Sequence, residues 1–529
     1  MGASREHHAV GGAEPIAPTE HTAVAAPAQS RRKFFAAAAA AALVMGSKEV
    51  KAQSIRRAKR KLPEPVRGVS LSLASAALPP DAQLSVWRDP VARLVRRVTL
   101  GITKDELARA QKLGFAKYLD EQLKPSRIDD REVAAFVTTT YPSLSLASEA
   151  LYGAEQNRAM TELQEATLYR AAFSKRQLHE RMVEFWTDHF SIDRNQVGYL
   201  KITDDRDVIR THALGKFPTL LKASAHSAAM MQYLDQPSSR RGNINENYAR
   251  EIMELHSIGV DGGYTQQDVS ELARVLTGWT VSGRGIFTYD AQIHDFGPKN
   301  VLGRTIPATL PARGLAGKNE ADAVIDSLAL SPKTAYYIAL KLTRFLLQYD
   351  PTDTLVQAVA TEFTRTKGDI PSMIRVILTQ QNLMAAPVKY KRPFHYAVSI
   401  VRALTPSVTS MSLIRSLVDN MGQSLFAWET PDGYPDKMEF WSGLVLARWN
   451  AATSIVGQTG ATFNFNVTPF VGTTAETGAD LIVERLFGGE VTTTLRTRIA
   501  DYLRPAPTNT ARVREAVGLA LSSAQFQWY

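Results

Sequence analysis

The sequence predicts a mainly α-helical protein, a large multi-helix domain with one small β-hairpin excursion near residues 279–310. From Trp87 onward, apolar residues recur at helical spacing in one segment after another. Short β-branched or aromatic pieces punctuated by glycines gather only in 279–310, a pattern typical of one or two hairpins. No later segment approaches the about 18 consecutive apolar residues that a membrane-spanning helix needs.

The expected helices follow from this periodicity and from their end signals. Ser331 followed by Pro332 is a capping residue before a proline in the first turn, which predicts a helix from there to about Leu347. Thr265 and Asp268 have the spacing of an N-terminal capping box. The other expected helical segments are 91–97, 105–113, 162–190, 217–234, 247–258, 354–364, 371–383, 393–404, 410–421, 437–454, 479–487, 493–503 and 510–523.

The N-terminal segment has the pattern of an export signal. Arg31 and Arg32 precede an aromatic pair and the alanine run 36–42, which is the order of a twin-arginine signal peptide. The sequence Val-Lys-Ala ending at Ala52 predicts cleavage after that residue. We therefore expect a signal peptide over 1–52, a basic linker rich in Pro, Ser and Ala over 53–86, and a helical domain over 87–529. The expected location is periplasmic or secreted, through the twin-arginine pathway.

Charge and cysteine content narrow the classes of partner and cofactor. The net charge of +10 comes largely from the N-terminal region, where residues 56–61 hold five basic side chains and no acid. This tail is either a solvated tether or a segment that contacts anionic surfaces. No basic stripe with interleaved aromatics suggests a nucleic-acid partner.

The absence of cysteine excludes thiolate-bound Fe–S clusters and haem c attachment. No nucleotide-binding motif occurs. The cofactor stays unknown, with a divalent metal held by His, Asp or Glu left open.

The densest chemistry lies in three neighbouring blocks: 185–190 (FWTDHF), 243–279, which contains NENYAREIMELH, and 294–299 (HDFGPK). Weaker matches lie at 94–100, 422–423 and 431–434 (PDGY). Together these blocks resemble the bacterial "domain of unknown function 1800" family over nearly all of the mature chain. The resemblance implies a largely helical, often exported protein. It also implies the company of an exported sulfatase- or phosphatase-like protein, and it supplies no established activity.

The helix expected over 247–258 divides into two faces. Helical spacing places Asn247, Glu251 and Glu254 on one stripe with Arg250 at its flank. His256 falls on the opposite, more apolar side. Two carboxylates and an amide on one stripe suit a hard cation or a proton-transfer group. An ordinary solvated helix face with an Arg–Glu pair is the alternative.

We assign candidate roles from these blocks. The candidate catalytic residues are His189, Glu251 and His256. The candidate substrate-binding residues are Asn247, Arg250, Glu254 and His294, and the metal ligands are unknown. His189 also shares a face with apolar residues, so a structural role as a buried core histidine is the alternative.

Two functions remain open. The first is an exported binding or accessory module that acts with an exported enzyme or a surface polymer, and we favour it because every candidate residue also has an adequate structural explanation. The second is a periplasmic hydrolase, metal-assisted or not, built on the His/Glu cluster. Whether the chain is an enzyme is left open by the sequence.

Overall fold

The computed structural model describes residues 87–309 and 315–529. The expected signal peptide, with Arg31, Arg32 and the cleavage after Ala52, and the expected linker 53–86 lie outside the described residues. The described chain begins at Trp87, which is buried.

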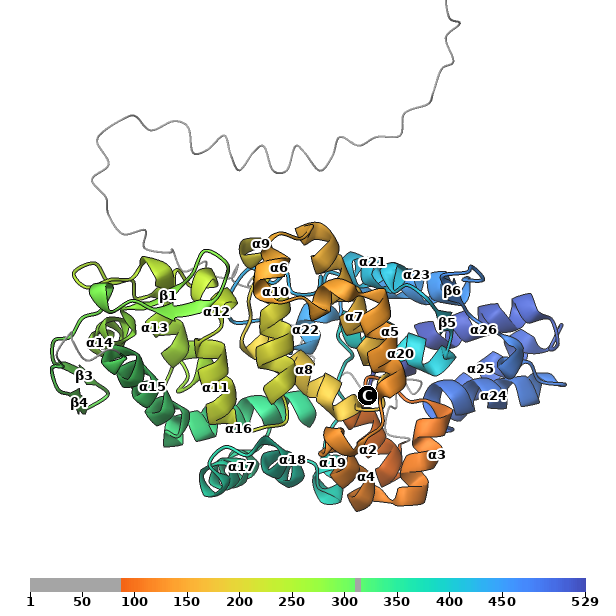
Figure 1. Cartoon of the computed structure of the whole chain (residues 1–529). Coiled ribbons are helices and arrows are strands. Elements are labelled where there is room, and N and C mark those ends of the chain that lie inside the picture. Colours follow the sequence, from red (N-terminus) through yellow and green to blue (C-terminus); the bar gives the residue numbers. More distant parts are fainter. Residues whose placement is uncertain (1–86, 310–314) are drawn as a thin grey trace, which may run out of the picture. The chain divides into compact units, whose positions relative to one another are not determined.

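The prediction of a mainly α-helical domain is confirmed (Figure 1). The first half of the described chain holds α2 (Pro90–Val98), α3 (Lys104–Leu113), α4 (Phe115–Gln122), α5 (Arg131–Thr140), α6 (Ser148–Tyr152), α7 (Gln156–Phe173), α8 (Gln177–His189), α9 (Arg194–Val197), α10 (Leu200–Thr203), α11 (Phe217–Ala225), α12 (Ala228–Tyr233), α13 (Asn247–Glu251), α14 (Gln266–Leu276) and α15 (Ala316–Ala329). Two π-helical segments interrupt this half, η4 (Asp204–Arg210) and η6 (Ile252–His256).

The second half continues the helical pattern. Its helices are α16 (Pro332–Leu346), α17 (Asp353–Thr366), α18 (Ile370–Ile377), α19 (Gln380–Ala385), α20 (Pro393–Leu404), α21 (Ser412–Asn420), α22 (Met438–Trp441), α23 (Val445–Val456), α24 (Ala475–Phe487), α25 (Thr493–Leu503) and α26 (Thr510–Ser522). Short 3₁₀ turns connect several helices of both halves, at Pro125–Arg127, Pro142–Ser145, Gln236–Ser238, Ala291–Ile293, Thr468–Phe470 and Ala524–Gln527.

The strands form three small antiparallel pairs. Two of them lie where the sequence predicts hairpins: β1 (Trp279–Val281) with β2 (Phe287–Tyr289), and β3 (Lys299–Val301) with β4 (Arg304–Ile306). The third pairs β5 (Ser407–Val408) with β6 (Phe463–Asn464) and was not predicted. Each of its strands has two residues, which is too few for a period-two pattern to show in the sequence.

Four periodic stretches are each two helices, so the prediction of single helices there was wrong. The stretch 371–383 breaks between α18 and α19, where Thr379 caps the second helix. The stretch 162–190 breaks at Ser174, whose hydroxyl donates to Asp130 at 2.8 Å. The stretch 217–234 breaks at Ser227, which caps α12. The stretch 437–454 breaks between Trp441 and Val445. Amphipathic periodicity continues across such short breaks because both helices bury the same side against one core.

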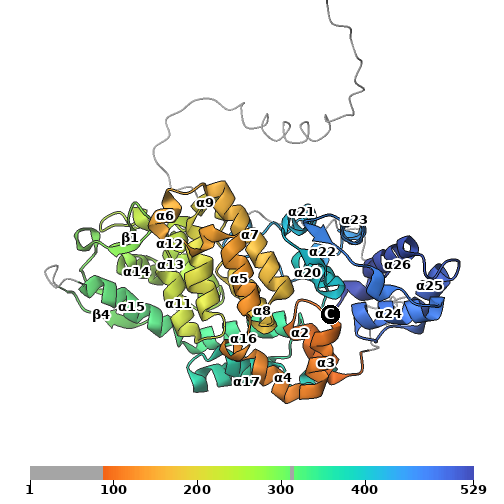
Figure 2. The same ribbon diagram turned by 45° about the vertical axis from the view of Figure 1, so that its right-hand side comes forward.

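The interior divides into two apolar clusters. The larger one gathers buried side chains between Ala92 and Ala386, together with Phe426. The second gathers α20, α21 and α23 to α26 and takes in Leu100, Leu168 and Ala171 from earlier helices. Figures 1 and 2 show α24, α25 and α26 (blue) side by side, as their contacts require. Within the described residues, no helix has both the length and the apolar character needed to cross a membrane.

Candidate functional site

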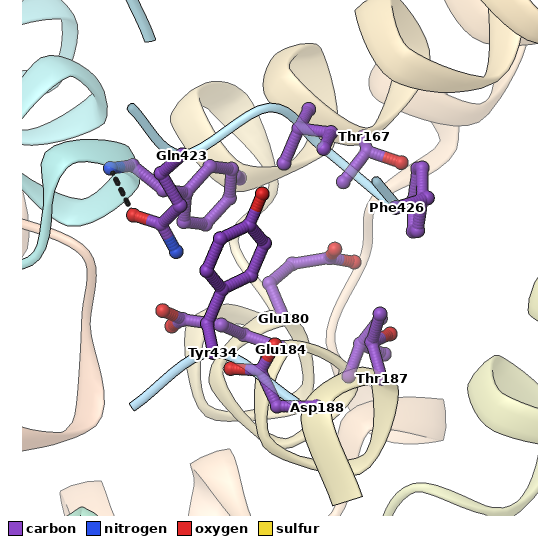
Figure 3. Close-up of a pocket in the computed structure, with 12 residues that line it drawn as sticks. Thr167, Glu180, Glu184, Thr187, Asp188, Gln423, Phe426 and Tyr434 are labelled. Carbon is purple, nitrogen blue, oxygen red and sulfur yellow. Dashed lines mark hydrogen bonds between the residues drawn. The ribbon is translucent and has the colours of Figure 1, made fainter. Parts of the chain in front are cut away.

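Three carboxylates line one pocket because they recur every four residues on α8. Glu180, Glu184 and Asp188 therefore share one face of the helix. The pocket is small and partly open, with a cavity volume of about 40 Å³. Figure 3 shows the ring of Tyr434 across from this carboxylate row, with Thr187 beside it.

The segment 423–434 forms the opposite wall and seats closely on α8. Gly433 has φ +77°, and a Cβ there would lie 2.0 Å from the backbone oxygen of Asp188. Only glycine fits this approach. The Tyr434 hydroxyl donates to the Ser424 carbonyl at 2.7 Å, which fixes the ring over the pocket. Two of the blocks singled out in the sequence, FWTDHF and PDGY, thus meet here.

Arginines compensate the carboxylate row. Arg210 Nη1 donates to both oxygens of Glu180 at 3.0 Å. Burial acts to raise the pKa of Glu180, but Arg210 and His179 outweigh it and hold that pKa at about 2. Glu184 accepts from Arg181 at 2.6 Å. These pairs place a guanidinium group against the carboxyl of Glu180 and another against that of Glu184.

Arg392 joins the other two members of the row. It donates to Glu184 and, through Nη1, to Asp188 Oδ2 at 2.5 Å. Burial nevertheless raises the pKa of Asp188, and the neighbouring carboxylates of Glu184 and Asp436 add to the rise that Arg392 opposes. The pKa of Asp188 thus lies above that of an ordinary aspartate.

Lys341 on α16 interacts electrostatically with Asp188. Burial lowers its pKa to about 8, an effect that Asp188 and Asp432 partly oppose. The pKa of the carboxyl is thus raised and that of the amine lowered, the direction in which burial shifts each kind of group.

Three polar groups of the pocket keep unused hydrogen-bonding capacity. Asp188 Oδ1 and the Thr187 hydroxyl make no hydrogen bond to any residue that the structure describes. Gln423 accepts from the Phe394 amide at 2.8 Å through its oxygen, the dashed line in Figure 3. Its Nε2 donates to nothing within the described chain. A donor, an acceptor and a hydroxyl therefore remain for a ligand.

His189 and His256, two of the predicted catalytic residues, lie together in the core. Their ring centroids are 6.2 Å apart, and His189 Nε2 lies 3.3 Å from the His256 carbonyl. Their exposed fractions are 1% and 2%. Aromatic rings surround the pair, including Trp186, Phe190 and Tyr337. Neither histidine lines the α8 pocket.

Burial removes the charge from both histidines. It lowers the pKa of His256 to about 3 and that of His189 well below its ordinary value, and nearby Lys341 acts in the same direction. Both rings are neutral at pH 7. His189 Nδ1 and His256 Nε2 are buried and find no partner among residues 87–309 and 315–529.

The helix expected over 247–258 changes its winding halfway. Asn247 to Glu251 are α-helical, but 252–256 wind as a π-helix, so the prediction of one α-helix was wrong. The division into two faces holds, since His256 is buried while Asn247, Glu251 and Glu254 are half-buried. π-helical segments are rare and recur at functional sites. In a stretch of five residues, the spacing of apolar residues in the sequence does not distinguish π-helical from α-helical winding.

The polar face of this helix forms a surface network. Arg250 contacts Glu254 at 3.4 Å and Glu246 at 3.3 Å, and it donates to Gln266 at 2.8 Å. This arrangement is the Arg–Glu pairing that the sequence offered as the alternative reading. Roles of Asn247, Glu251 and Glu254 in catalysis or substrate binding stay predictions.

His294 belongs to a different cluster from His189 and His256. Its Nδ1 lies 2.5 Å from the Thr277 carbonyl and its Nε2 3.9 Å from Glu320, which pairs with Lys299 at 2.7 Å. Gly317 packs so closely that an added Cβ would lie 2.5 Å from the His294 ring. The contacts of His294 in the described chain are with Thr277, Glu320 and nearby rings, none of them another candidate residue.

The described residues contain no group of three or more His, Asp or Glu side chains placed to hold a metal ion. The identity of any cofactor therefore stays open. Sequence reasoning missed the acidic row of α8, although its signal is present. Carboxylates at positions 180, 184 and 188 repeat at the spacing that stacks side chains on one helix face.

One family matches the chain in the comparisons with known proteins. It is described as "Protein of unknown function (DUF1800)" and matches residues 93–528. Neither the curated proteins nor the solved structures gave a match.

Proposed function

We propose that this chain, which belongs to the DUF1800 family, is an exported protein that binds a sugar unit of a surface polymer in the α8 pocket. The observation that carries the proposal is the unused hydrogen-bonding capacity of Asp188 Oδ1, Thr187 and Gln423 Nε2. Thr187 and Asp188 are half-buried, so water satisfies these groups in the free protein and a ligand with matching hydroxyls can replace that water.

The charge balance favours a hydroxyl-rich, neutral ligand. The three carboxylates of the row pair with the guanidinium groups of Arg181, Arg210 and Arg392, and Arg210 is shared with Asp205. A strongly charged ligand would find no excess of opposite charge. Sugar hydroxyls both donate and accept, so one sugar face can use the Asp188 acceptor and the Gln423 donor together.

The apolar walls suit one face of a single ring. Phe394, Phe426 and Tyr434 line the pocket beside the polar groups, and flat aromatic surfaces suit the apolar face of a sugar. Only about 40 Å³ of the pocket is open to water-sized groups, so the edge of one ring enters it and a long chain does not. The bound unit is therefore a chain end or a branch of the polymer.

Export rests on the sequence. The twin-arginine pair, the short apolar run and the small-residue cleavage pattern support a periplasmic or secreted location, where surface polymers and an exported enzyme partner are accessible. The same location suits an accessory role beside such an enzyme.

Hydrolysis at the same pocket is the second candidate. It is favoured by the raised pKa of Asp188 and the lowered pKa of Lys341, which are the shifts expected of a proton donor and a proton acceptor. In this case the sugar bound at Asp188 would be cleaved, with or without a metal, instead of only held.

Calorimetric titration with a panel of defined oligosaccharides and soluble cell-wall fragments tests the proposal. Thr187→Val removes a hydroxyl and Gln423→Glu replaces the free donor while keeping an acceptor for Phe394. Each is expected to weaken binding about tenfold, the cost of about one lost hydrogen bond to a ligand. Thr161→Val, an exposed threonine bonded to its own helix at 2.9 Å, is the matched control and should bind normally.

The same mixtures distinguish the two candidates. Chromatography of the oligosaccharides after prolonged incubation is expected to show them intact if the protein only binds. Shortened products that disappear in Asp188→Asn would favour the hydrolase. Absence of binding across the panel, or equal weakening in Thr161→Val, would contradict the proposed site.

A further inference from the structure

A second, smaller cavity lies between α2, the start of α20 and the last residues of the chain. It has a volume of about 20 Å³ and is lined by Arg96, Lys391, His395 and Ser399, with Phe526 and Tyr529. That volume holds one water molecule or one monatomic ion.

Lys391 is the unusual member of this cavity. Its exposed fraction is 6%, its Nζ donates to the Ser399 hydroxyl at 3.2 Å, and it lies 3.8 Å from the centroid of the Phe526 ring. No carboxylate pairs with it in the described chain. Three other buried lysines each have a carboxylate: Lys201 with Asp204, Lys299 with Glu320 and Lys389 with Asp436.

Other nitrogens around the cavity also lack hydrogen-bond partners. Arg96 Nε and His395 Nε2 are buried and have no hydrogen-bond partner within the described residues. The remaining bond of Arg96 goes to the Phe487 carbonyl at 2.5 Å, and its nearest carboxylate oxygen, on Glu490, is 4.0 Å away. Lys391 Nζ and Arg96 Nε do not accept hydrogen bonds here, and His395 Nε2 donates in one of the two neutral tautomers, so the cavity suits an occupant that only accepts.

The surrounding charge is positive. Arg448 and Arg96 act electrostatically on Lys391, and together with burial they lower the pKa of that lysine well below its ordinary value. Arg97 lies on the same helix as Arg96 and donates to the main-chain oxygen of Tyr529 at 3.0 Å. An anion beside Lys391 would offset this excess charge, whereas a water molecule would not.

The backbone closes the cavity tightly enough to select by size. Gly101 has φ +143°, and a Cβ there would lie 2.7 Å from Ser399 Cα, so the chain passes directly against α20 at this point. There is no room for an oxyanion such as sulfate.

We propose that this cavity is a structural halide site, in which one chloride ion accepts hydrogen bonds from Lys391, Arg96 and His395. The ion links α2 to the start of α20. It therefore stabilises the junction between the two apolar clusters without taking part in the α8 pocket, whose function does not depend on it.

Thermal unfolding of protein dialysed into sodium gluconate tests the site. Adding sodium chloride or bromide at constant ionic strength is expected to raise Tm by about 3 °C and to saturate, as for a ligand that binds only the folded state. Gluconate is excluded from protein surfaces more strongly than chloride, so a general salt effect would have the opposite sign. Equal or lower Tm in chloride would overturn the proposal.

Two further measurements locate the ion. Crystals soaked in bromide should show an anomalous peak in the cavity beside Lys391, and a peak absent from that position would overturn the assignment. Lys391→Met should abolish the halide-dependent rise in Tm. The matched control Lys201→Met removes an equally buried lysine that has its own carboxylate, and it should keep the rise even if its Tm is lower. If Lys391→Met does not fold, the bromide soak of the unmodified protein still decides.

Discussion

At the scale of residues, the site is defined by polar atoms that have no hydrogen-bond partner within the described residues. Asp188 and Arg392 are bonded to each other, yet one oxygen of Asp188 stays available at the pocket. The neighbouring residue, His189, has the opposite character, because it is neutral and enclosed by rings. A helix turns about 100° per residue. Asp188 can therefore face the pocket while the adjacent His189 packs in the core.

The buried histidines make stability depend on acid. The unfolded chain takes up a proton at His256 near pH 6.5 and the folded chain only near pH 3. Between these values the unfolded state binds more protons, so the free energy of unfolding falls as the pH drops below about 6.5. We expect His256→Phe to reduce that loss by on the order of 2–3 kcal/mol between pH 6.5 and 4. Urea unfolding at a series of pH values measures it, and an unchanged acid slope in the variant would contradict burial of a neutral His256.

At the scale of elements, the sequence predicted helix existence well and helix winding poorly. The bounds 393–404 and 493–503 agree with α20 and α25, since each helix starts and ends at clear local signals. The capping box at Thr265 and Asp268 is also present. The π segments were not predictable. Asp205 and Arg210 pair at 2.9 Å across five residues, a spacing that an α-helix would place on different faces.

The candidate site was predicted only in part, because periodicity indicates which side of a helix is buried but not which segment covers it. Periodicity indicated that His189 and His256 face the interior, and the structure brings them together. It could not indicate which distant segment would cover α8. That contact depends on Gly433, which lies far along the chain and whose close approach has no local sequence signal.

The seating of segment 423–434 gives a test at this scale. Gly433→Ala would require a positive φ and place a Cβ 2.0 Å from the Asp188 carbonyl. We expect it to lower the free energy of unfolding by about 3 kcal/mol or more and to abolish ligand binding. Gly242→Ala is the control, since φ is +80° there but no atom lies within 4 Å of the added Cβ. That variant should lose only about 1 kcal/mol. Similar losses in both would show that the close contact is absent.

At the scale of the whole molecule, the proposed function requires export. We expect Arg31→Lys with Arg32→Lys to leave an uncleaved precursor in the cytoplasm, because the arginine pair is read as an address. Fractionation followed by mass spectrometry of the N-terminus checks both the location and the cleavage after Ala52. Mature protein of normal amount outside the cytoplasm in the double variant would contradict export by this route.

The central claim is that the α8 pocket binds a hydroxyl-rich ligand, and a crystal structure with the tightest-binding oligosaccharide tests it most directly. The account predicts one sugar ring within hydrogen-bond distance of Asp188 Oδ1, Gln423 Nε2 and the Thr187 hydroxyl, with Tyr434 against its apolar face. A sugar bound elsewhere on the molecule, with the α8 pocket holding only water, would contradict it.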